Sequence, residues 1–309
     1  MHASVHQRFW RPAGAYSLNA SIGVLRRSSS DPCMLFHEGA WWLAFRASGN
    51  AVSLRLQAIE GGVQAKAFGP GAETALEALP ALLGENDDWK EFDSATFQSS
   101  LPPLVREARR RNPGVRLPAT GRVIDSLIPA VLEQKVTGQE AFRGYRLLIR
   151  WYGSEPPGPA PTGLRLAPSP EEWLKIPSWD WHRAGVGPQR SDTLMRALKR
   201  STGLARLGQA EAAAASQALQ SIPGIGVWTA AEVLQHSHGD PDSIAVGDYH
   251  LAGFVGTALT GTPVEDDRML ELLEPWRGHR QRVVRLLYLS GTVKERHGPR
   301  MSVRDYRKI

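Results

Sequence analysis

The feature that most constrains this chain is a short turn at residues 222–226, Ile-Pro-Gly-Ile-Gly, which separates two segments of helix-forming residues. The first segment, 210–218, is mostly alanine, the strongest helix former. The second, 228–235, places apolar residues at helical spacing. The proline cannot continue a helix, and the glycines allow a left-handed backbone. The stretch 219–230 therefore predicts a helix–hairpin–helix.

The hairpin has a physical use beyond turning the chain. Its glycines carry no Cβ, so another backbone can approach closely. The first amides of the second helix lack helical partners and suit an anion such as a phosphate. Such a turn also joins helices in proteins that bind no anion, so the pattern alone leaves both interpretations open. The residues that we expect at the phosphate are Ile222, Gly224, Ile225, Gly226 and Thr229.

An aspartate downstream of the hairpin supplies context. Asp248 follows the short apolar run 244–246 and Gly247, and it precedes a segment of helical apolar spacing that begins at Leu251. Aspartate is a preferred N-cap, so one role for Asp248 is to cap that helix. The other role is a carboxylate held at a helix start, facing whatever the hairpin binds.

Together these residues resemble a known family. The hairpin, Trp228 two residues after its second glycine, and the Gly247-Asp248-Tyr249 motif are similar to those of the helix–hairpin–helix/Gly-Pro-Asp DNA glycosylases. Within that superfamily, the chain is most similar to the 3-methyladenine DNA glycosylase II branch. The resemblance covers roughly residues 100–295. Further segments that resemble the branch are 112–118, 127–137 and 275–277.

The resemblance implies a monofunctional DNA glycosylase of base-excision repair. Such an enzyme flips a damaged base, here expected to be alkylated, out of duplex DNA and hydrolyses its glycosidic bond. Asp248 matches the family's catalytic aspartate, whose carboxylate stabilises the oxocarbenium-like sugar. Bifunctional relatives carry a nucleophilic lysine at the position of Trp228, which cannot form a Schiff base. Trp228 matches instead an aromatic wall that makes a cation–π contact with an alkylated base, and core packing is its alternative role.

Three positions depart from the pattern of the branch or align loosely with it. Glu232 stands one turn after Trp228, where the branch tends to carry an aromatic residue. Glu232 either points to solvent or enters the base pocket, where it could bind an exocyclic amine or protonate a neutral leaving base. Lys135 replaces the bulky apolar wedge that fills the gap left by the flipped base, so Gln134 or a neighbour is an alternative gap filler. Arg285 falls about where the branch keeps a pocket aromatic.

The sequence predicts no cofactor apart from a monovalent cation. In the family, hairpin carbonyls bind such a cation, and the matching carbonyls here belong to Ile222 and Ile225. The one cysteine, Cys33, excludes an internal disulfide and a cysteine-ligated zinc or iron–sulfur site. The stretch 236–242 contains two histidines, but it lies where a helix ends, which favours capping and turn formation over metal binding.

Charge and composition indicate the partner and the location. The chain has 309 residues and a formal net charge of +6, which suits a polyanion. We expect double-stranded DNA as the partner and a monomer as the functional form. The first residues lack the apolar core of a signal peptide, and no stretch is apolar enough to span a membrane. The expected location is therefore the cytoplasm, at the nucleoid.

The expected fold class is mainly α with an N-terminal α+β domain. Residues 1–100 predict an antiparallel sheet with one or two helices, and residues 101–295 predict a two-lobed helical glycosylase core. Residues 296–309 form a basic tail. No residue in the N-terminal domain has a predicted role in the chemistry. The expected strands are 34–37, 40–46, 52–59 and 63–68, and a helix is expected at 72–84.

Three local patterns carry predictions of their own. Residues 101–114 predict a basic helix with a solvated arginine face. The stretch 153–163 is rich in proline and glycine and predicts a surface loop. Ser169 followed by Pro170 predicts a helix start.

Two other functions stay open on the sequence alone. One is a non-catalytic helix–hairpin–helix DNA-binding protein that lost productive chemistry because of Glu232 and Lys135. The other is an oxidised-base glycosylase with lyase activity, which would form a covalent adduct that borohydride traps.

Overall fold

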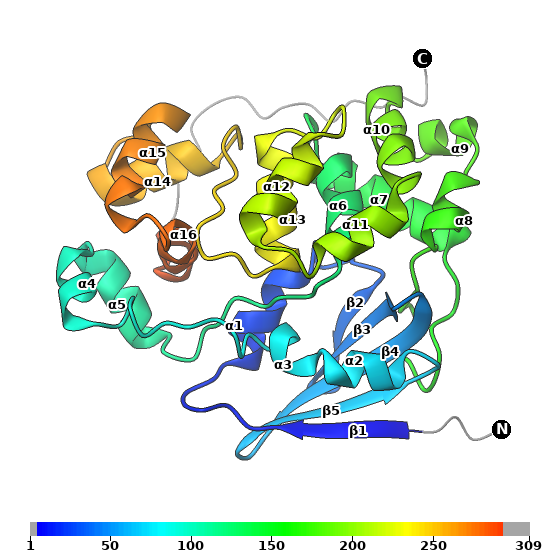
Figure 1. Ribbon diagram of the computed structural model, residues 1–309, viewed down its shortest axis with the longest axis horizontal. Helices are drawn as coiled ribbons and strands as arrows, with labels where there is room; N and C mark the ends of the chain where they lie inside the picture. The colour runs from blue at the N-terminus through cyan, green and yellow to red at the C-terminus, as the bar shows by residue number, and fades with distance from the viewer. Residues whose placement is uncertain (1–4, 293–309) are drawn as a thin grey trace.

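The computed structural model describes residues 5–292, in which a five-stranded antiparallel sheet packs beside a larger group of helices (Figure 1). Helices and an antiparallel sheet both occur as predicted, and the sheet ends at Phe68. The basic tail at 296–309 lies outside the described residues. Within residues 5–292, no helix combines the length and the apolar character needed to cross a membrane. The domain boundaries and the two-lobed form of the core remain predictions.

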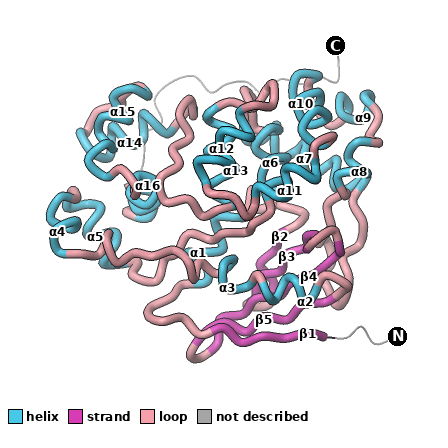
Figure 2. The backbone as a smooth tube through the Cα atoms, in the orientation of Figure 1, coloured by secondary structure: helices cyan, strands magenta, loops and turns pink. Residues whose placement is uncertain are grey.

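The sheet has the strand order β1-β5-β4-β3-β2, and every neighbouring pair is antiparallel (Figure 2). Its strands are β1 Val5–Trp10, β2 Met34–His37, β3 Ala40–Ala47, β4 Asn50–Ile59 and β5 Gly62–Phe68. Strands β2 to β5 match the four predicted strands. The sequence does not predict β1, because its residues 6–8 are polar and only Trp10 is buried. Pairing with β5 along the whole strand holds β1 in place.

One face of the sheet is covered by short helices. Helices α1, Leu18–Ile22, and α2, Ala72–Glu77, pack on apolar side chains from all five strands. The predicted helix 72–84 is interrupted, because a second helix, α3 at Leu79–Leu82, begins after Ala78. Pro80 explains the interruption, since it has no N–H for a helical bond to the preceding turn.

The other face of the sheet is covered by residues 153–166, which we call the strap. Apolar strap residues pack against Trp42 and Phe68, whose rings stack with centroids 6.0 Å apart. The Ser53 hydroxyl donates a hydrogen bond to the Pro157 carbonyl of the strap across 2.7 Å. The strap is irregular, as the sequence predicts, but it also packs on this face of the sheet and buries its apolar side chains.

The remaining helices lie mainly on the other side of the molecule from the sheet. They are α4 Ala95–Ser100, α5 Pro103–Arg111, α6 Val123–Leu132, α7 Gly138–Tyr152, α8 Pro170–Leu174, α9 Ser178–Arg183, α10 Pro188–Leu198, α11 Ser201–Leu207, α12 Ala212–Gln220, α13 Val227–Ser237, α14 Leu251–Thr260, α15 Asp266–Leu273 and α16 Arg280–Leu289, with 3-10 helices η1 Gly23–Leu25 and η2 Glu274–Trp276. The helix start predicted at Ser169 is confirmed, since its hydroxyl accepts from the Glu172 amide and forms a capping box.

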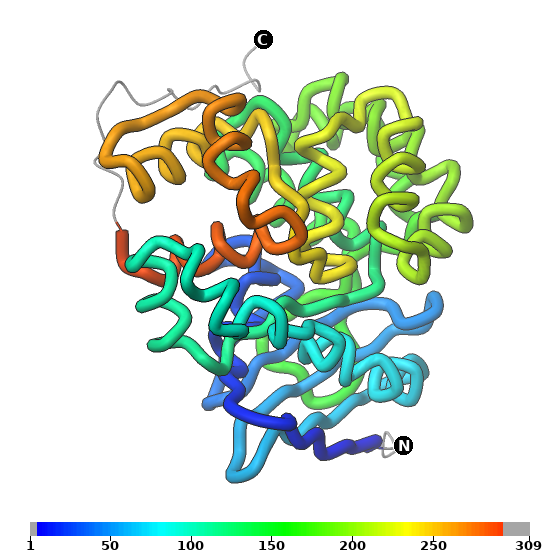
Figure 3. The backbone as a smooth tube through the Cα atoms, turned by 60° about the vertical axis from the view of Figure 1, so that its left-hand side comes forward, coloured from blue at the N-terminus to red at the C-terminus, as the bar shows by residue number. Residues whose placement is uncertain are grey.

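The helices bury two separate hydrophobic cores. The first joins α6, α7, α10, α12 and α13 around residues such as Leu127. The second joins α5, α14, α15 and α16 around residues such as Trp89. Helix α13 serves both, because Val233 belongs to the first core and Ala231 to the second. Figure 3 shows the green segments of the first core and the orange segments of the second on opposite sides of the helical part.

The predicted basic helix corresponds to α5, but its arginine face is not wholly solvated. Arg110 and Arg111 are exposed as predicted. Arg109 is buried, and that part of the prediction is wrong. Its guanidinium pairs with Asp93 at 2.7 Å and lies 4.0 Å from the centroid of the Trp89 ring. A carboxylate and an aromatic face from the preceding segment therefore compensate for burying the charge.

Candidate active site

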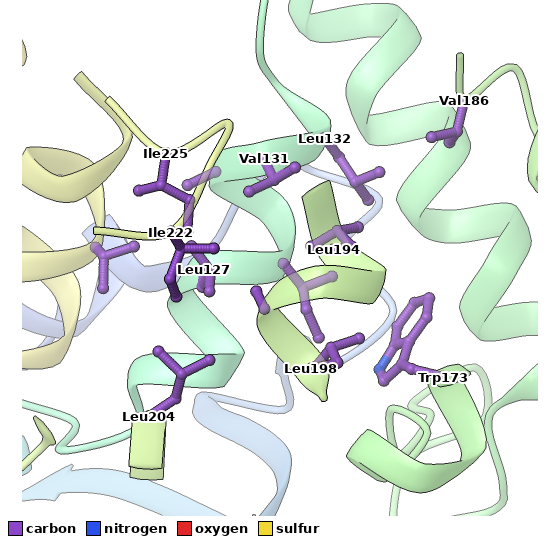
Figure 4. Close-up of a cluster of buried hydrophobic side chains, with 14 of the residues drawn as sticks. Leu127, Val131, Leu132, Trp173, Val186, Leu194, Leu198, Leu204, Ile222 and Ile225 are labelled. Atoms are coloured by element: carbon purple, nitrogen blue, oxygen red, sulfur yellow. The ribbon is translucent and has the colours of Figure 1, made fainter. Parts of the chain in front are cut away.

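The hairpin between α12 and α13 is anchored by two isoleucines. Ile222 and Ile225 are both buried, and the Ile225 amide donates to the Ile222 carbonyl across 3.0 Å. Their side chains lie beside Leu127 and Val131 of α6 (Figure 4). Burying these side chains leaves the backbone between them at the surface, where Gly224 is exposed.

The left-handed turn requires glycine at position 224. The φ of Gly224 is +97°, and a Cβ there would come within 2.2 Å of the Thr193 hydroxyl oxygen. Two side chains brace the turn from outside it. Gln134 Nε2 donates to the Gly224 carbonyl across 2.9 Å, and Arg196 Nε donates to the Pro223 carbonyl across 3.1 Å. The hairpin conformation is therefore held by side chains of helix α10 and of the loop that follows α6.

The first turn of α13 presents unpaired amides. Gly226 is the N-cap residue and has no side chain that could satisfy them. Gly226 is exposed, whereas Thr229 is buried and its hydroxyl accepts from Gln134 Nε2 across 2.8 Å. The backbone of this turn, rather than the Thr229 hydroxyl, is thus the part that is available to an anion.

Asp248 directs its two carboxylate oxygens to different partners. Oδ1 accepts from the backbone amides of His250, at 2.8 Å, and Leu251, at 2.9 Å, and so satisfies the start of α14. Oδ2 accepts from Trp228 Nε1 across 3.3 Å. Both roles that the sequence left open are therefore compatible, because one oxygen caps the helix while the other faces the residue that follows the hairpin.

Glu232 does not point to solvent. Its side chain is 17% exposed, and its Oε2 lies 3.6 Å from Arg27 Nη1. The same Arg27 nitrogen lies 3.6 Å from Oε1 of Glu133, at the end of α6. Burial, together with the nearby Glu133 and Asp248 charges, raises the pKa of Glu232 to about 7, against the opposing effect of Arg27. Burial also raises the pKa of Glu133.

Arg27 is a site residue that sequence reasoning missed. It lies in the loop after η1, in the part of the chain with no predicted role in the chemistry. Asp31 orients the loop by accepting from the Arg27 amide across 3.0 Å. No local pattern in the sequence distinguishes Arg27 from its neighbour Arg26, because its partners, Glu133 and Glu232, come from distant segments.

Helix α16 carries the predicted Arg285 and, on the same face, a second candidate residue, Tyr288. Arg285 is partly buried, and its Nη2 donates to the Ala20 carbonyl of α1 across 2.8 Å. Its role in a base pocket remains a prediction. Tyr288, three residues later, is 51% exposed and stacks on Phe254 with centroids 4.4 Å apart. Burial and the charges of Asp248 and Glu232 raise the pKa of Tyr288 to about 12.

Tyr288 was missed because the helical register was ambiguous. Arg285 and Tyr288 are three residues apart and so share one face of α16. A shift of one helical turn in comparing this helix with the family exchanges one for the other. The aromatic type of Tyr288 is the signal that could have found it.

The two gap-filling candidates have different environments. The Gln134 amide group is already bonded to the hairpin carbonyl of Gly224 and to Thr229. Lys135 is exposed and has a φ of +54°, which is unusual for a residue with a Cβ. The backbone thus presents Lys135 at the tip of the loop after α6, while Gln134 belongs to the support of the hairpin.

The histidine-containing stretch 236–242 has structural contacts. His236 Nδ1 donates to the Glu232 carbonyl across 2.7 Å, and burial lowers its pKa to about 3. His238 donates to the Leu207 carbonyl across 3.0 Å. Among residues 5–292, no group of three or more His, Cys, Asp or Glu side chains is arranged to hold a metal ion.

Comparison with solved structures identifies the fold. The 3-methyladenine DNA glycosylase from Archaeoglobus fulgidus aligns with 92% of this chain and 98% of its own, with a TM-score of 0.75 and 17% identity. The 8-oxoguanine glycosylase/lyase from Clostridium acetobutylicum, in complex with DNA, aligns with 94% of this chain and 98% of its own, with a TM-score of 0.67 and 12% identity. The 3-methyladenine DNA glycosylase of Schizosaccharomyces pombe, in complex with abasic DNA, aligns with 62% and 92%, with a TM-score of 0.51 and 18% identity.

No family model and no curated protein matches the sequence. The structural likeness nevertheless defines a class, since the chain has the fold of the helix–hairpin–helix DNA glycosylases. The likeness to the archaeal 3-methyladenine DNA glycosylase extends almost from end to end of both chains. It therefore includes the N-terminal sheet as well as the helices.

Proposed function

We propose that this protein is a monofunctional DNA glycosylase that releases damaged bases, chiefly alkylated ones, from duplex DNA. The observation that carries the proposal is the placement of Asp248. Its carboxylate is fixed at the start of α14 by two backbone amides and directed at Trp228, in the first turn after the hairpin. A negative charge held beside a turn that can bind a DNA phosphate is in a suitable place to assist cleavage of the glycosidic bond of that nucleotide.

DNA would be held by the hairpin and its braces. The α13 amides after Gly226 bind the phosphate that sets the register, at the positive end of the helix. The target nucleotide rotates out of the stack at a cost of a few kcal/mol. Lys135, at the exposed tip of the loop after α6, fills the gap that the flipped base leaves in the stack. Its positive charge also attracts the phosphates of the opposite strand.

The hairpin carbonyls would suit a monovalent cation next to the bound phosphate. Carbonyl oxygens are hard ligands that suit such ions. The carbonyls of Pro223 and Gly224 already accept from Arg196 and Gln134. The Ile222 and Ile225 carbonyls, which accept from no side chain among the described residues, would hold the cation. Its bound charge would neutralise part of the phosphate charge.

Asp248 acts on the sugar. As the glycosidic bond breaks, positive charge develops on the sugar ring, and a carboxylate beside it stabilises that charge. The charge forms only in the transition state, so the interaction accelerates the reaction rather than merely tightening binding. Water then attacks C1′, and Asp248 can orient it or take its proton.

Two aromatic side chains supply the walls for the base. Trp228 is partly buried and fixed through its indole N–H, and Tyr288 is half exposed and supported by Phe254. An alkylated base with a fixed positive charge binds an electron-rich ring through a cation–π contact of up to about 2 kcal/mol when dry. The carboxylates nearby add to this attraction, which supports alkylated bases as substrates.

The proposal is tested by identifying the released bases. Duplexes containing alkylated, oxidised or deaminated bases are incubated with the protein, and the soluble products are analysed by mass spectrometry. Release of an intact methylated purine supports the function. Absence of any free base, with binding to DNA intact, would support the non-catalytic DNA-binding protein instead.

We expect no covalent adduct when the protein acts on damaged duplex in the presence of borohydride. Trp228 occupies the position at which bifunctional relatives carry lysine, and indole cannot form a Schiff base. Denaturing gel electrophoresis of labelled DNA provides the measurement, with a bifunctional glycosylase/lyase as the positive control. A trapped band with this protein would contradict the monofunctional mechanism.

We expect Arg196→Gln to weaken binding of undamaged duplex and to lower the slope of log affinity against log salt by about 1. Arg196 is exposed, and its guanidinium is fixed against the Pro223 carbonyl, next to the proposed phosphate site. Fluorescence anisotropy titrations at several salt concentrations measure the slope. Arg268→Gln, an exposed arginine of α15, is the matched control. An unchanged slope in Arg196→Gln would show that Arg196 neutralises no DNA phosphate.

A further inference from the structure

We propose that Glu232 is the proton donor to the departing base, that Arg27 positions its carboxyl group, and that the neighbouring Glu133 favours its protonated form. This inference rests on the proposed glycosylase function. It assigns the enzyme a second class of substrate, namely damaged bases that are uncharged in DNA. It also gives the N-terminal domain a part in the active site.

Glu232 lies near the two residues that we assign to the substrate, Trp228 and Asp248. Trp228 and Glu232 are four residues apart on α13, so they share a helix face. Trp228 is hydrogen-bonded to Asp248, whose charge acts directly on Glu232. Trp228 is proposed to stack on the base and Asp248 to face the sugar. Glu232 therefore lies one helical turn after Trp228, on the face of α13 that we assign to the base.

The charge balance of the group favours retention of a proton. The single guanidinium of Arg27 lies 3.6 Å from two carboxyl groups, those of Glu133 and Glu232. The negative charge of Asp248 also acts on both of these carboxyl groups. Glu133 and Glu232 are less than one fifth exposed, so water screens their repulsion weakly. Two negative charges in such a site repel each other, and this repulsion favours the protonated form of one of the two carboxyl groups.

The other ionisable groups around Glu232 do not replace this proton. His236, one turn further along α13, is neutral because burial lowers its pKa to about 3. Tyr288 of α16 keeps its own proton, since burial and the two carboxylates raise its pKa to about 12. Arg285 of α16 is directed to the Ala20 carbonyl. The groups that set the ionisation of Glu232 are therefore Arg27, Glu133 and Asp248.

The chemistry explains why such a donor is useful. An alkylated purine with a fixed positive charge leaves as a neutral molecule when the glycosidic bond breaks. An uncharged damaged base would leave as an anion unless a proton reached one of its ring nitrogens. A well-placed general acid accelerates such a step by about 10²- to 10⁴-fold.

The proposed step is balanced. The Glu232 carboxyl proton moves to a ring nitrogen of the base as the electron pair of the C1′–N bond moves to the base. Water adds to C1′ and loses a proton, and Glu232 is reprotonated from solvent. The products are the neutral base and the sugar with a hydroxyl group at C1′, so one water molecule is consumed and no other reactant is needed.

Two lesions separate the roles of Glu232 and Asp248. One duplex carries 7-methylguanine, which is cationic, and the other carries hypoxanthine, which is neutral. We expect Glu232→Gln to reduce hypoxanthine release by about 100-fold or more, and 7-methylguanine release by less than about tenfold. Retained 7-methylguanine release shows that the variant folds. Glu60→Gln, in the exposed turn between β4 and β5, is the matched control.

The outcomes distinguish this inference from the proposed function. If the wild type releases 7-methylguanine but not hypoxanthine, or if Glu232→Gln reduces both releases equally, the proton-donor role is wrong and the glycosylase function stands. If the wild type releases neither base, nor any other damaged base, both proposals fail. A selective loss of hypoxanthine release supports the inference.

A pH profile tests the positioning residues. A carboxyl group donates a proton only below its pKa, so wild-type hypoxanthine release should fall above about pH 7. Arg27 lowers the pKa of Glu232 and Glu133 raises it. Arg27→Gln should therefore move this decline to higher pH, and Glu133→Gln should move it to lower pH. Shifts of the two variants in the same direction, or no shift, would overturn the positioning role, since a purely structural defect lowers the rate without moving the profile in opposite directions.

Discussion

Asp248→Asn should lose base release by on the order of 10³-fold while it binds damaged duplex about as well as the wild type. Asparagine has nearly the same shape, and its carbonyl oxygen can still accept from the His250 and Leu251 amides at the start of α14. The fold and the hairpin are therefore retained. Only the negative charge is lost, and that charge matters most when the sugar becomes cationic.

Single-turnover release of 7-methylguanine measures the chemical step, and anisotropy measures binding of the same duplex. Asp267→Asn is the matched control, because Asp267 is an exposed aspartate in the first turn of α15. A fall of less than about tenfold in Asp248→Asn would remove Asp248 from the chemistry and leave it as a helix cap. Loss of binding together with release would indicate a structural role.

The second large effect concerns stability. We expect Asp87→Ala to lower the free energy of unfolding by about 3–5 kcal/mol. The Asp87 and Arg282 side chains are 3% and 5% exposed and form an ion pair between the segment before α4 and helix α16. Asp87 also accepts from the Leu117 amide across 2.7 Å, and Arg282 lies 5.0 Å from the centroid of the Trp89 ring. Removing the carboxylate leaves a buried guanidinium without its counter-ion.

Urea denaturation followed by circular dichroism measures this loss, and Asp88→Ala is the control, since the Asp88 side chain is 63% exposed. The double variant Asp87→Leu, Arg282→Leu should recover part of the stability, because it removes both charges at once. A loss below about 1 kcal/mol in Asp87→Ala would show that the pair is screened by solvent and contributes as little as a surface pair.

The sequence predicted the features that local chemistry determines. The hairpin follows from a proline and two glycines between strong helix formers, and α12 and α13 flank it as expected. The start of α8 follows from Ser169 and Pro170. In these cases the residues that specify an element lie within it or directly beside it.

Features that depend on distant partners could not be predicted in the same way. Strand β1 has no apolar alternation and exists because β5 supplies its hydrogen bonds. Arg27 resembles any surface arginine until the fold brings it between Glu133 and Glu232. Arg109 belongs to a run of arginines, and only Asp93 and Trp89 distinguish it. The positions of Asp248, Trp228 and Glu232 along the chain were available from the sequence, but the side-chain contacts among them were not.

The strap limits how this protein can be truncated or fused to another protein. The chain leaves the sheet after β5, builds α4 to α7, and then returns through residues 153–166 to cover Trp42 and Phe68 before it continues into the remaining helices. The sheet of the N-terminal part thus shares a buried apolar cluster with the strap. A shortened protein that began at the helical part would expose the apolar underside of the strap to water. A graft of the sheet onto another helical core would have to carry the strap with it.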